Sequence, residues 1–177
     1  MYFNSKNSVN LVVVSNEKYL NYAVPLVRSI SNNCTNINIH LYLINSYDKK
    51  IDKKILKRVK SVKIYKVFKE FETKKDESAF CANYRFTVIP SLLKKYSNNI
   101  IYLDADSIVR CNLSEEPIIN EYFKKFDVAI STAKNISLEN FNFKAKKNTS
   151  FRTGVMIISN NESSYNFFER VRERVIK

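Results

Sequence analysis

Short apolar runs alternate with amphipathic segments along most of this chain. Residues 9–14, Val-Asn-Leu-Val-Val-Val, form the kind of nearly continuous apolar run found in strands that are buried on both faces of a sheet. A helical pattern follows over residues 19–31, with Pro25 marking or kinking its first turns. The same reasoning predicts further strands over Ile37–Ile44, Val62–Val67 and residues 99–103, 126–131 and 155–159, and further helices over residues 51–59, 84–96 and 167–175.

Strands that alternate with helices favour an α/β fold in which a mostly parallel central sheet is flanked by helices. No repeat, low-complexity tract or Gly/Ser/Pro linker divides the sequence, so residues 1–177 are expected to form a single domain. Ligands of such sheets bind beyond the carboxyl ends of the strands. Residues 15–17 and 104–106 both follow predicted strands, so we expect them to share one crevice.

The composition supports a packed, folded chain. Of its 177 residues, 45% are apolar and 13% are aromatic, which is enough to build a core. No apolar run approaches the roughly 18 to 20 residues of a membrane span, and the first ten residues do not resemble a signal peptide. The three cysteines, Cys34, Cys81 and Cys111, are far apart in the sequence, as expected for free thiols in a reducing compartment. A cytoplasmic location is therefore expected.

The net charge of +13 either draws the protein toward anionic partners or reflects a drift toward Lys and Asn throughout the sequence. The basic residues between positions 49 and 58 mostly avoid the apolar stripe of their predicted helix and indicate a solvated face. Residues 167–177 combine two aromatic rings with arginines, which allows peripheral contact with an acidic membrane surface at the inner membrane face. The aromatic residues fall in apolar patterns rather than in a basic stacking surface, which argues against nucleic acid as a partner.

The most informative stretch is Ile-Ile-Tyr-Leu-Asp-Ala-Asp-Ser-Ile-Val over residues 100–109. A predicted buried strand ends there in Asp104 and Asp106, two carboxylates separated by one small residue. Two ionised carboxylates so close together repel one another, and a bound divalent cation such as Mg²⁺ or Mn²⁺ compensates the negative charge of both. A pair of aspartates that form a turn or cap a helix is the alternative interpretation.

The rest of the sequence narrows the chemistry that such a pair serves. A phosphatase of the haloacid-dehalogenase type needs further paired carboxylates, but Asp127 is the only aspartate after Asp106. A nucleotidyltransferase resembling polymerase beta needs a Gly-Ser turn before the pair, but the single glycine, Gly154, lies after it. The same lack of glycine excludes glycine-rich phosphate loops, and the single histidine excludes most zinc sites. The remaining possibility for the aspartate pair is a site in which a metal ion binds a diphosphate leaving group.

Four segments, in order, resemble glycosyltransferase family 8, which contains the glycogenins and bacterial lipopolysaccharide galactosyl- and glucosyltransferases. The most specific is Ile-Tyr-Leu-Asp-Ala-Asp-Ser-Ile-Val over residues 101–109, which is close to the family's metal motif. Residues 12–20 are similar to the family's first strand and base-binding loop, and residues 83–93 to its helix with the pattern Tyr-x-Arg. Residues 151–158 are similar to its strand Phe-Asn-Ala-Gly-Val-Met-Leu-Ile.

The resemblance implies a glycosyltransferase-A fold, a Rossmann-like nucleotide-sugar-binding domain, with a UDP-sugar donor, Mn²⁺ or Mg²⁺ as cofactor and retention of anomeric configuration. It makes Asp104 and Asp106 the metal ligands and places Asn16 where relatives have a uracil-contacting aspartate. It places Arg85 near the diphosphate or the sugar, and Gly154 where the backbone approaches the donor or a strand bends. The residues implied in catalysis are Asp104, Asp106, Arg85 and Arg152, and those implied in cofactor binding are Val14, Ser15, Asn16, Tyr19, Tyr84, Arg85, Asp104, Ala105, Asp106 and Gly154.

Several positions depart from the family pattern. Arg152 stands where relatives have asparagine and is expected to contact phosphate or an acidic sugar, and Thr132 stands near the place of an acidic residue. A Gln-Asp pair and a C-terminal histidine of the family are missing, and His40, the only histidine, is expected to be a packed strand residue. The chain is therefore expected to be a compact variant in which water replaces a metal ligand, or else a truncated or degenerate domain.

These observations predict a hexosyltransferase that moves a hexose from a UDP-sugar to a glycan or lipid-linked saccharide acceptor. A non-catalytic nucleotide-sugar-binding remnant of such an enzyme is the alternative. Residues 134–150 carry four lysines and one glutamate between two predicted strands. We interpret them either as a flap that favours an anionic acceptor or as a solvated loop.

Overall fold

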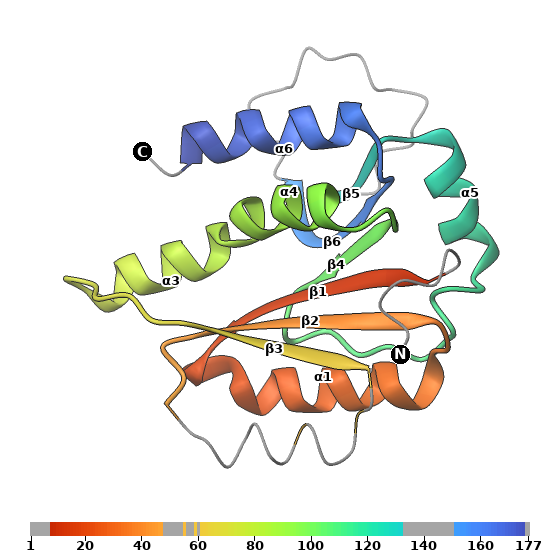
Figure 1. Cartoon of the computed structure of the whole chain (residues 1–177). Coiled ribbons are helices and arrows are strands. Elements are labelled where there is room, and N and C mark those ends of the chain that lie inside the picture. The colour runs from red at the N-terminus through yellow and green to blue at the C-terminus, as the bar shows by residue number, and fades with distance from the viewer. Residues whose placement is uncertain (1–7, 48–54, 56–58, 60, 133–150, 176–177) are drawn as a thin grey trace.

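The central element of the molecule is a six-stranded sheet in the order β3-β2-β1-β4-β6-β5 (Figure 1). The computed structural model describes residues 8–47, 55, 59, 61–132 and 151–175, and for residues 131–132 and 151–153 it describes the backbone alone. Among the described strands only β6 runs opposite to the direction of the others, so the predicted mostly parallel sheet is confirmed. The strands are β1 Val9–Asn16, β2 Ile37–Ile44, β3 Val62–Val67, β4 Ile100–Leu103, β5 Val128–Thr132 and β6 Phe151–Ile158.

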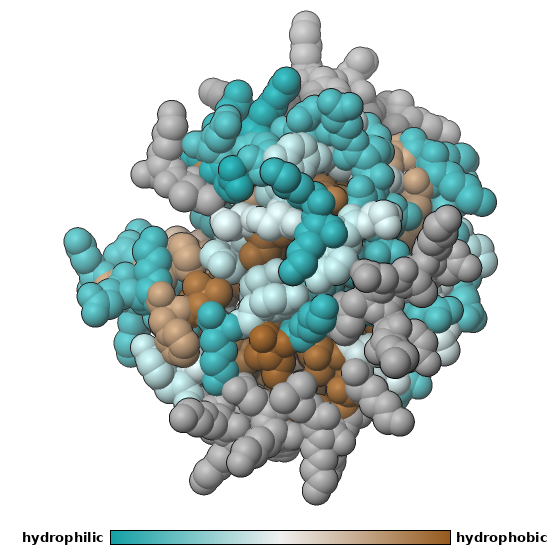
Figure 2. All heavy atoms as spheres, in the orientation of Figure 1, coloured by the Kyte–Doolittle hydropathy of each residue, from teal (hydrophilic) through white to brown (hydrophobic). Residues whose placement is uncertain are grey.

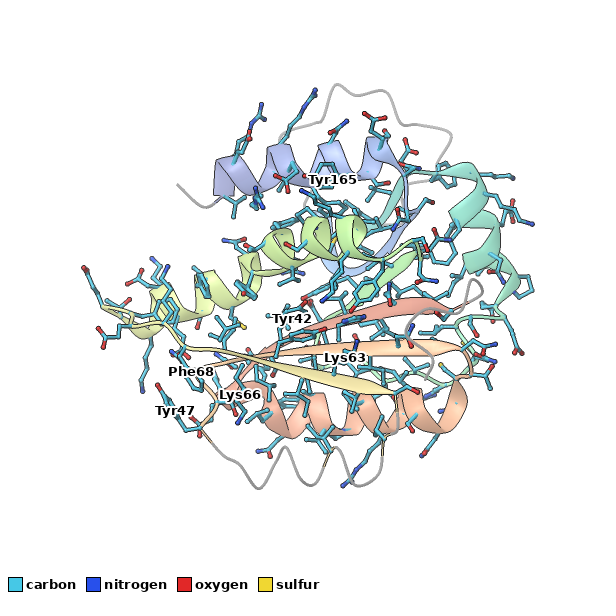
Figure 3. All side chains as sticks on the ribbon, viewed as in Figure 1. Tyr42, Tyr47, Lys63, Lys66, Phe68 and Tyr165 are labelled. Atoms are coloured by element: carbon cyan, nitrogen blue, oxygen red, sulfur yellow. The ribbon has the colours of Figure 1, made fainter. Side chains whose placement is uncertain are left out.

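Helices cover both faces of this sheet (Figure 1). On one face lies α1, Leu20–Asn33, which follows the short 3-10 helix η1, Glu17–Tyr19. On the other face lie α4, Arg85–Lys95, and α6, Glu162–Val175, which pack against one another. Tyr165 of α6 points toward α4 (Figure 3) and joins the core between these helices and the sheet.

Strand β1 is buried on both faces because its side chains alternate between two cores. Leu11 and Val13 belong to the core under α1, whereas Val12 and Val14 belong to the core under α4 and α6. All four side chains are at most 5% exposed, and each such burial contributes roughly 1.5 to 3 kcal/mol. The apolar run in the sequence is thus nearly continuous because neither face of this strand is exposed to solvent.

Two helices were not predicted from the sequence. Helix α3, Lys74–Asn83, begins with a capping box between Thr73 and Asp76 but buries none of its own residues, so no apolar stripe reveals it. Helix α5, Pro117–Lys125, starts at a proline and buries only Ile119. The helix predicted over residues 51–59 lies outside the described residues, except for two buried positions, Ile55 and Val59.

Hydrophilic side chains cover most of the face seen in Figure 2, with hydrophobic atoms visible in a few places between them. Within the described ranges, no helix has the length and apolar character that a membrane crossing needs. The three cysteines are free thiols, as the sequence predicted.

A buried polar cluster surrounds His40 in the middle of β2. Its Nδ1 lies 3.1 Å from the hydroxyl of Tyr65 and its Nε2 lies 3.1 Å from Oδ1 of Asn10. Burial, together with the nearby charges of Lys63 and Lys95, lowers the pKa of His40 to about 4. His40 is therefore a neutral, packed strand histidine, in agreement with the sequence prediction.

The lowered pKa of His40 makes stability depend on pH. The unfolded chain protonates this histidine below about pH 6.5, whereas the folded protein resists protonation until about pH 4, so stability falls as the pH decreases through this window. Urea denaturation at pH 7 and pH 5 should show a loss of roughly 2 kcal/mol in the free energy of unfolding that His40→Gln largely lacks. An equal loss in the variant would assign the pH dependence to other groups.

Candidate functional site

The carboxyl ends of β1 and β4 open into a cavity of about 250 Å³. Residues 14–16 border it from β1, residues 104–106 from the end of β4, and residues of α3 and α4 from the helical side. The parallel strands direct their carboxyl ends toward the side on which α3 lies, at the left of Figure 1. The two strand-end segments singled out in the sequence thus meet at one crevice, as expected for a parallel sheet.

Most of the residues predicted to bind the cofactor lie at this cavity. Tyr84 and Gly154 are not among the lining residues. The ring of Tyr84 packs against Tyr42 and Phe80, with ring centroids 6.1 and 5.1 Å away. The backbone of Arg152 lies in β6, but its side chain is outside the described residues, as is the whole of segment 134–150. The predicted residues that line the cavity are Val14, Ser15, Asn16, Tyr19, Arg85, Asp104, Ala105 and Asp106.

Arg85 and Asp104 form an ion pair beside the cavity. Nη1 of Arg85 donates to Oδ1 of Asp104 at 3.1 Å, and Nε of Arg85 donates to the carbonyl of Ala82. Arg85 is only 8% exposed, so its guanidinium is largely withdrawn from water. Because a charge withdrawn from water costs several kcal/mol without partners, these contacts fix the junction of α3 and α4 against the end of β4.

Tyr102 completes this contact from within β4. Its hydroxyl donates to the same Oδ1 of Asp104 at 2.8 Å, and Cζ of Arg85 lies 4.8 Å from its ring centroid. Burial raises the pKa of Tyr102 well above its usual range, although Arg85 opposes the shift, so the hydroxyl remains a donor. Oδ1 of Asp104 therefore accepts two hydrogen bonds, while the described residues give Oδ2 none.

A tight turn carries the second carboxylate of the pair. The N–H of Ser107 donates to the carbonyl of Asp104 at 3.0 Å, and the turn buries Ala105 while Asp106 stays exposed at the cavity. In the described part of the chain Asp106 has no ion-pair partner, and no cluster of three or more potential metal ligands occurs. The pair thus forms a turn and also presents two carboxylates, and a cation here would complete its shell with water or substrate oxygens.

Gly154 lies against Asp104 on the neighbouring strand β6. Its carbonyl accepts the N–H of Asp104 at 2.8 Å. A Cβ atom at this position would lie 2.9 Å from Oδ2 of Asp104, which is closer than such atoms approach in proteins. The glycine therefore leaves room for the carboxylate oxygen that carries no hydrogen bond from the described residues.

At the end of β1, Asn16 caps the short helix η1. Its Oδ1 accepts the N–H of Tyr19 at 3.2 Å, which satisfies one of the free amides at a helix start. Asn16 itself is 5% exposed, whereas Tyr19 is 41% exposed. The rings of Tyr19 and Tyr22 lie side by side, with centroids 6.0 Å apart, so an accessible aromatic surface borders this part of the cavity.

Four further residues at the cavity were not predicted: Ser78, Cys81, Ala82 and Tyr102. The first three share one face of α3, the helix that lacks an apolar pattern. Tyr102 did carry a signal, because a residue two positions before Asp104 in a strand points to the same side. Burial raises the pKa of Cys81 to about 11, so this thiol is protonated near neutral pH.

Several solved structures that superpose on this chain are glycosyltransferases. The galactosyltransferase LgtC, in complex with donor and acceptor sugar analogues, superposes with a TM-score of 0.63 at 16% identity over 94% of this chain and 63% of its own. GlyE of Streptococcus pneumoniae TIGR4 superposes with a TM-score of 0.54 at 15% identity, over 96% of this chain and 39% of its own. Mouse xyloside xylosyltransferase 1 superposes with a TM-score of 0.54 at 14% identity, over 96% of this chain and 76% of its own. The chain thus spans less than two thirds of the length of LgtC and GlyE. No curated protein matches the sequence.

These likenesses establish the glycosyltransferase-A fold, as the sequence predicted. The sequence itself matches the profile of the family described as glycosyl transferase family 8 over residues 10–175. The chain therefore belongs to glycosyl transferase family 8, and the resemblance based on four segments is confirmed.

Replacing Gly154 by alanine should disturb the Asp104 carboxylate without unfolding the protein, because the added methyl group meets Oδ2. If a cation at this pair binds a nucleotide diphosphate, as the sequence predicts, the affinity for UDP in the presence of Mn²⁺, measured by calorimetry, should fall about tenfold or more. The free energy of unfolding should change by only about 1 kcal/mol. The neighbouring variant Val155→Ala, as a control, should keep the wild-type affinity. Full affinity in Gly154→Ala would mean that Oδ2 plays no part in binding.

Proposed function

We propose that this chain is a metal-dependent glycosyltransferase that transfers a hexose from a UDP-sugar to a glycan or lipid-linked saccharide, with retention of configuration. The observation that carries the proposal is the meeting of Asp104, Asp106 and Arg85 at one cavity beyond the ends of parallel strands. Carboxylates beside a guanidinium suit a metal–diphosphate group, because the carboxylates attract the metal cation and the guanidinium attracts the diphosphate anion. Membership of family 8 and the glycosyltransferase neighbours support the reaction class.

The two aspartates fit a hard divalent cation such as Mn²⁺ or Mg²⁺. Asp104 offers Oδ2, which the described residues leave without a hydrogen bond, and the exposed Asp106 offers a second carboxylate. Arg85 and Tyr102 hold Asp104 through its other oxygen, a kind of support that orients metal ligands. The bound cation would neutralise the charge that develops on the diphosphate leaving group.

Arg85 would supply a second positive charge toward the diphosphate. The carbonyl of Ala82, the carboxylate of Asp104 and the ring of Tyr102 hold its guanidinium in place before any substrate arrives. A fixed charge stabilises a developing anion without reorganisation during the reaction. Asn16 and Tyr19 would hold the nucleoside part of the donor at the end of β1.

The described residues favour front-face attack over a covalent glycosyl-enzyme. The Cys81 thiol, with its pKa raised to about 11, is a poor nucleophile, and Oδ1 of Asp104 is engaged by Arg85 and Tyr102. In front-face attack the acceptor oxygen bonds to the anomeric carbon while the bond from that carbon to the diphosphate oxygen breaks. A diphosphate oxygen takes the proton of the acceptor hydroxyl. Attack from the side of the leaving group retains the configuration.

The proposals for the acceptor and for contact with a membrane are inferred mainly from charged residues. Four lysines in residues 134–150 support an anionic acceptor, although this segment lies outside the described residues. The free cysteines support a cytoplasmic enzyme. Helix α6 carries the exposed Phe167 beside several arginines, which supports peripheral contact with an acidic membrane surface. Arg172 is paired with Glu169, which weakens that attraction.

A non-catalytic nucleotide-sugar-binding remnant is the second candidate. It is favoured by one observation, namely that the described residues provide no third protein ligand for a cation at the aspartate pair. Such a protein would bind the donor through Asp104, Arg85 and Asn16 without breaking it.

Hydrolysis of sugar nucleotides separates the two candidates. The protein is incubated with UDP-glucose or UDP-galactose in the presence of Mn²⁺ or of EDTA, and the released UDP is measured. We expect release that requires Mn²⁺, because the cation stabilises the leaving group. Binding of the UDP-sugar without release would support the remnant, and a protein that neither binds nor hydrolyses would contradict both.

A further inference from the structure

Two of the three cysteines lie close together where α1 ends. The thiol of Cys34, the residue that follows α1, donates to the carbonyl of Cys111 at 3.4 Å. A carbonyl oxygen lies about 2.4 Å from the Cα atom of its own residue, so the sulfur of Cys34 lies within about 6 Å of the Cα atom of Cys111. Because Cys111 is exposed, rotation of its side chain can bring its sulfur toward that of Cys34, as a disulfide requires.

Hydrogen bonds on both sides of this pair hold the two segments together. Before Cys34, Nδ2 of Asn33 donates to the carbonyl of Val109 at 3.0 Å. After Cys34, the N–H of Thr35 donates to Oδ1 of Asn112 at 3.2 Å, and Nδ2 of Asn112 donates to the hydroxyl of Thr35 at 2.9 Å. Val109 and Asn112 likewise lie on either side of the second cysteine in the sequence. The fold thus places the two residues opposite one another, which limits the distortion that a bond between them would cause.

The two thiols differ in their surroundings. Cys34 is half-buried and packs against the core under α1, whereas Cys111 is exposed. Burial raises the pKa of Cys34, and the charge of a Cys111 thiolate raises it further, although a backbone hydrogen bond from Leu113 opposes the shift. An oxidant in solution therefore meets Cys111 first, and Cys34 is the thiol beside it.

We propose that Cys34 and Cys111 form a site of reversible oxidation, at which a peroxide links the two residues by an intramolecular disulfide. This inference goes beyond the proposed function, because it requires neither a nucleotide nor a metal ion. The thiolate of Cys111 attacks one oxygen of hydrogen peroxide, and the O–O bond breaks. A sulfenic acid forms on Cys111, and the other oxygen takes up the thiol proton and leaves as water.

The second step forms the disulfide. The sulfur of Cys34 attacks the sulfenic sulfur of Cys111, the S–O bond breaks, and the hydroxyl group leaves with the Cys34 proton as a second water. The two sulfur atoms together lose two electrons, which the peroxide takes up. A dithiol reductant returns both residues to thiols, so the site responds to the redox state of its surroundings, as cytosolic disulfides mostly do.

The bond would fasten the segment that follows the aspartate turn to the end of α1. The N–H of Val109 already donates to the hydroxyl of Ser29 in α1 at 3.0 Å, so this segment lies along the helix before any oxidation. A disulfide from residue 34 to residue 111 closes a long loop, and closing a long loop in the unfolded chain stabilises the folded state. The oxidised protein should therefore be the more stable form.

Thiol counting on the whole chain tests this inference. The reduced protein is treated with hydrogen peroxide, denatured and alkylated, and its peptides are analysed by mass spectrometry. We expect the number of free thiols to fall from three to one, with Cys81 as the one that remains, in a monomer that has lost two hydrogen atoms. Dithiothreitol should restore all three thiols. The midpoint of thermal unfolding should be higher in the oxidised protein by roughly 5 to 10 °C.

Single variants separate the roles of the two cysteines. Cys34→Ser should stop at a sulfenic acid on Cys111, which dimedone traps, and Cys111→Ser should leave Cys34 as a thiol. Cys81→Ser is the matched control and should form the disulfide as the wild type does. The inference would be overturned by a wild type that keeps three thiols, by one in which Cys111 is oxidised while Cys34 stays a thiol, or by a disulfide that links two chains through Cys111.

Discussion

The contact between Arg85 and Asp104 is the constraint on which the rest of the site depends. Because a charge withdrawn from water costs several kcal/mol, the fold has to provide partners for a guanidinium that is only 8% exposed. The carbonyl of Ala82, the carboxylate of Asp104 and the ring of Tyr102 do so, and they come from α3, from the end of β4 and from β4 itself. One buried charge thereby joins two helices to the central sheet at the edge where the cavity opens.

Because of the same contact, the two oxygens of the Asp104 carboxylate have different hydrogen-bonding environments. Oδ1 is occupied by Arg85 and Tyr102, whereas Oδ2 lies in the space that Gly154 leaves open on the adjacent strand. The turn that follows exposes Asp106 at the same cavity. In the proposed function, Oδ2 of Asp104 and the carboxylate of Asp106 would together hold a cation at the cavity, with a substrate phosphate completing its shell.

The elements that could be predicted from the sequence are those with a strong apolar pattern. Strands β2 and β3 have the predicted bounds, because each is a short apolar or alternating run between polar turns. Helix α3 was missed because it buries no residue, and the cavity residues Ser78, Cys81 and Ala82 were missed with it. The resemblance to the family's Tyr-x-Arg helix implied that Tyr84 binds the donor, but a helix directs successive residues to different sides, and Tyr84 packs against Tyr42 instead. The pairing of Arg85 with Asp104, residues far apart in the sequence, depends on tertiary structure and had no local signal.

In the proposed function, Asp104 and Asp106 bind a cation that in turn binds the diphosphate of the donor. The most direct measurement is the calorimetric affinity of UDP for the wild type with Mn²⁺, for the wild type with EDTA, and for Asp106→Asn with Mn²⁺. Asp106 is exposed and has no ion-pair partner among the described residues, so the variant should fold normally. We expect EDTA and the substitution each to weaken UDP binding by about tenfold to hundredfold. UDP affinity that is the same in all three samples would contradict this role of the two aspartates.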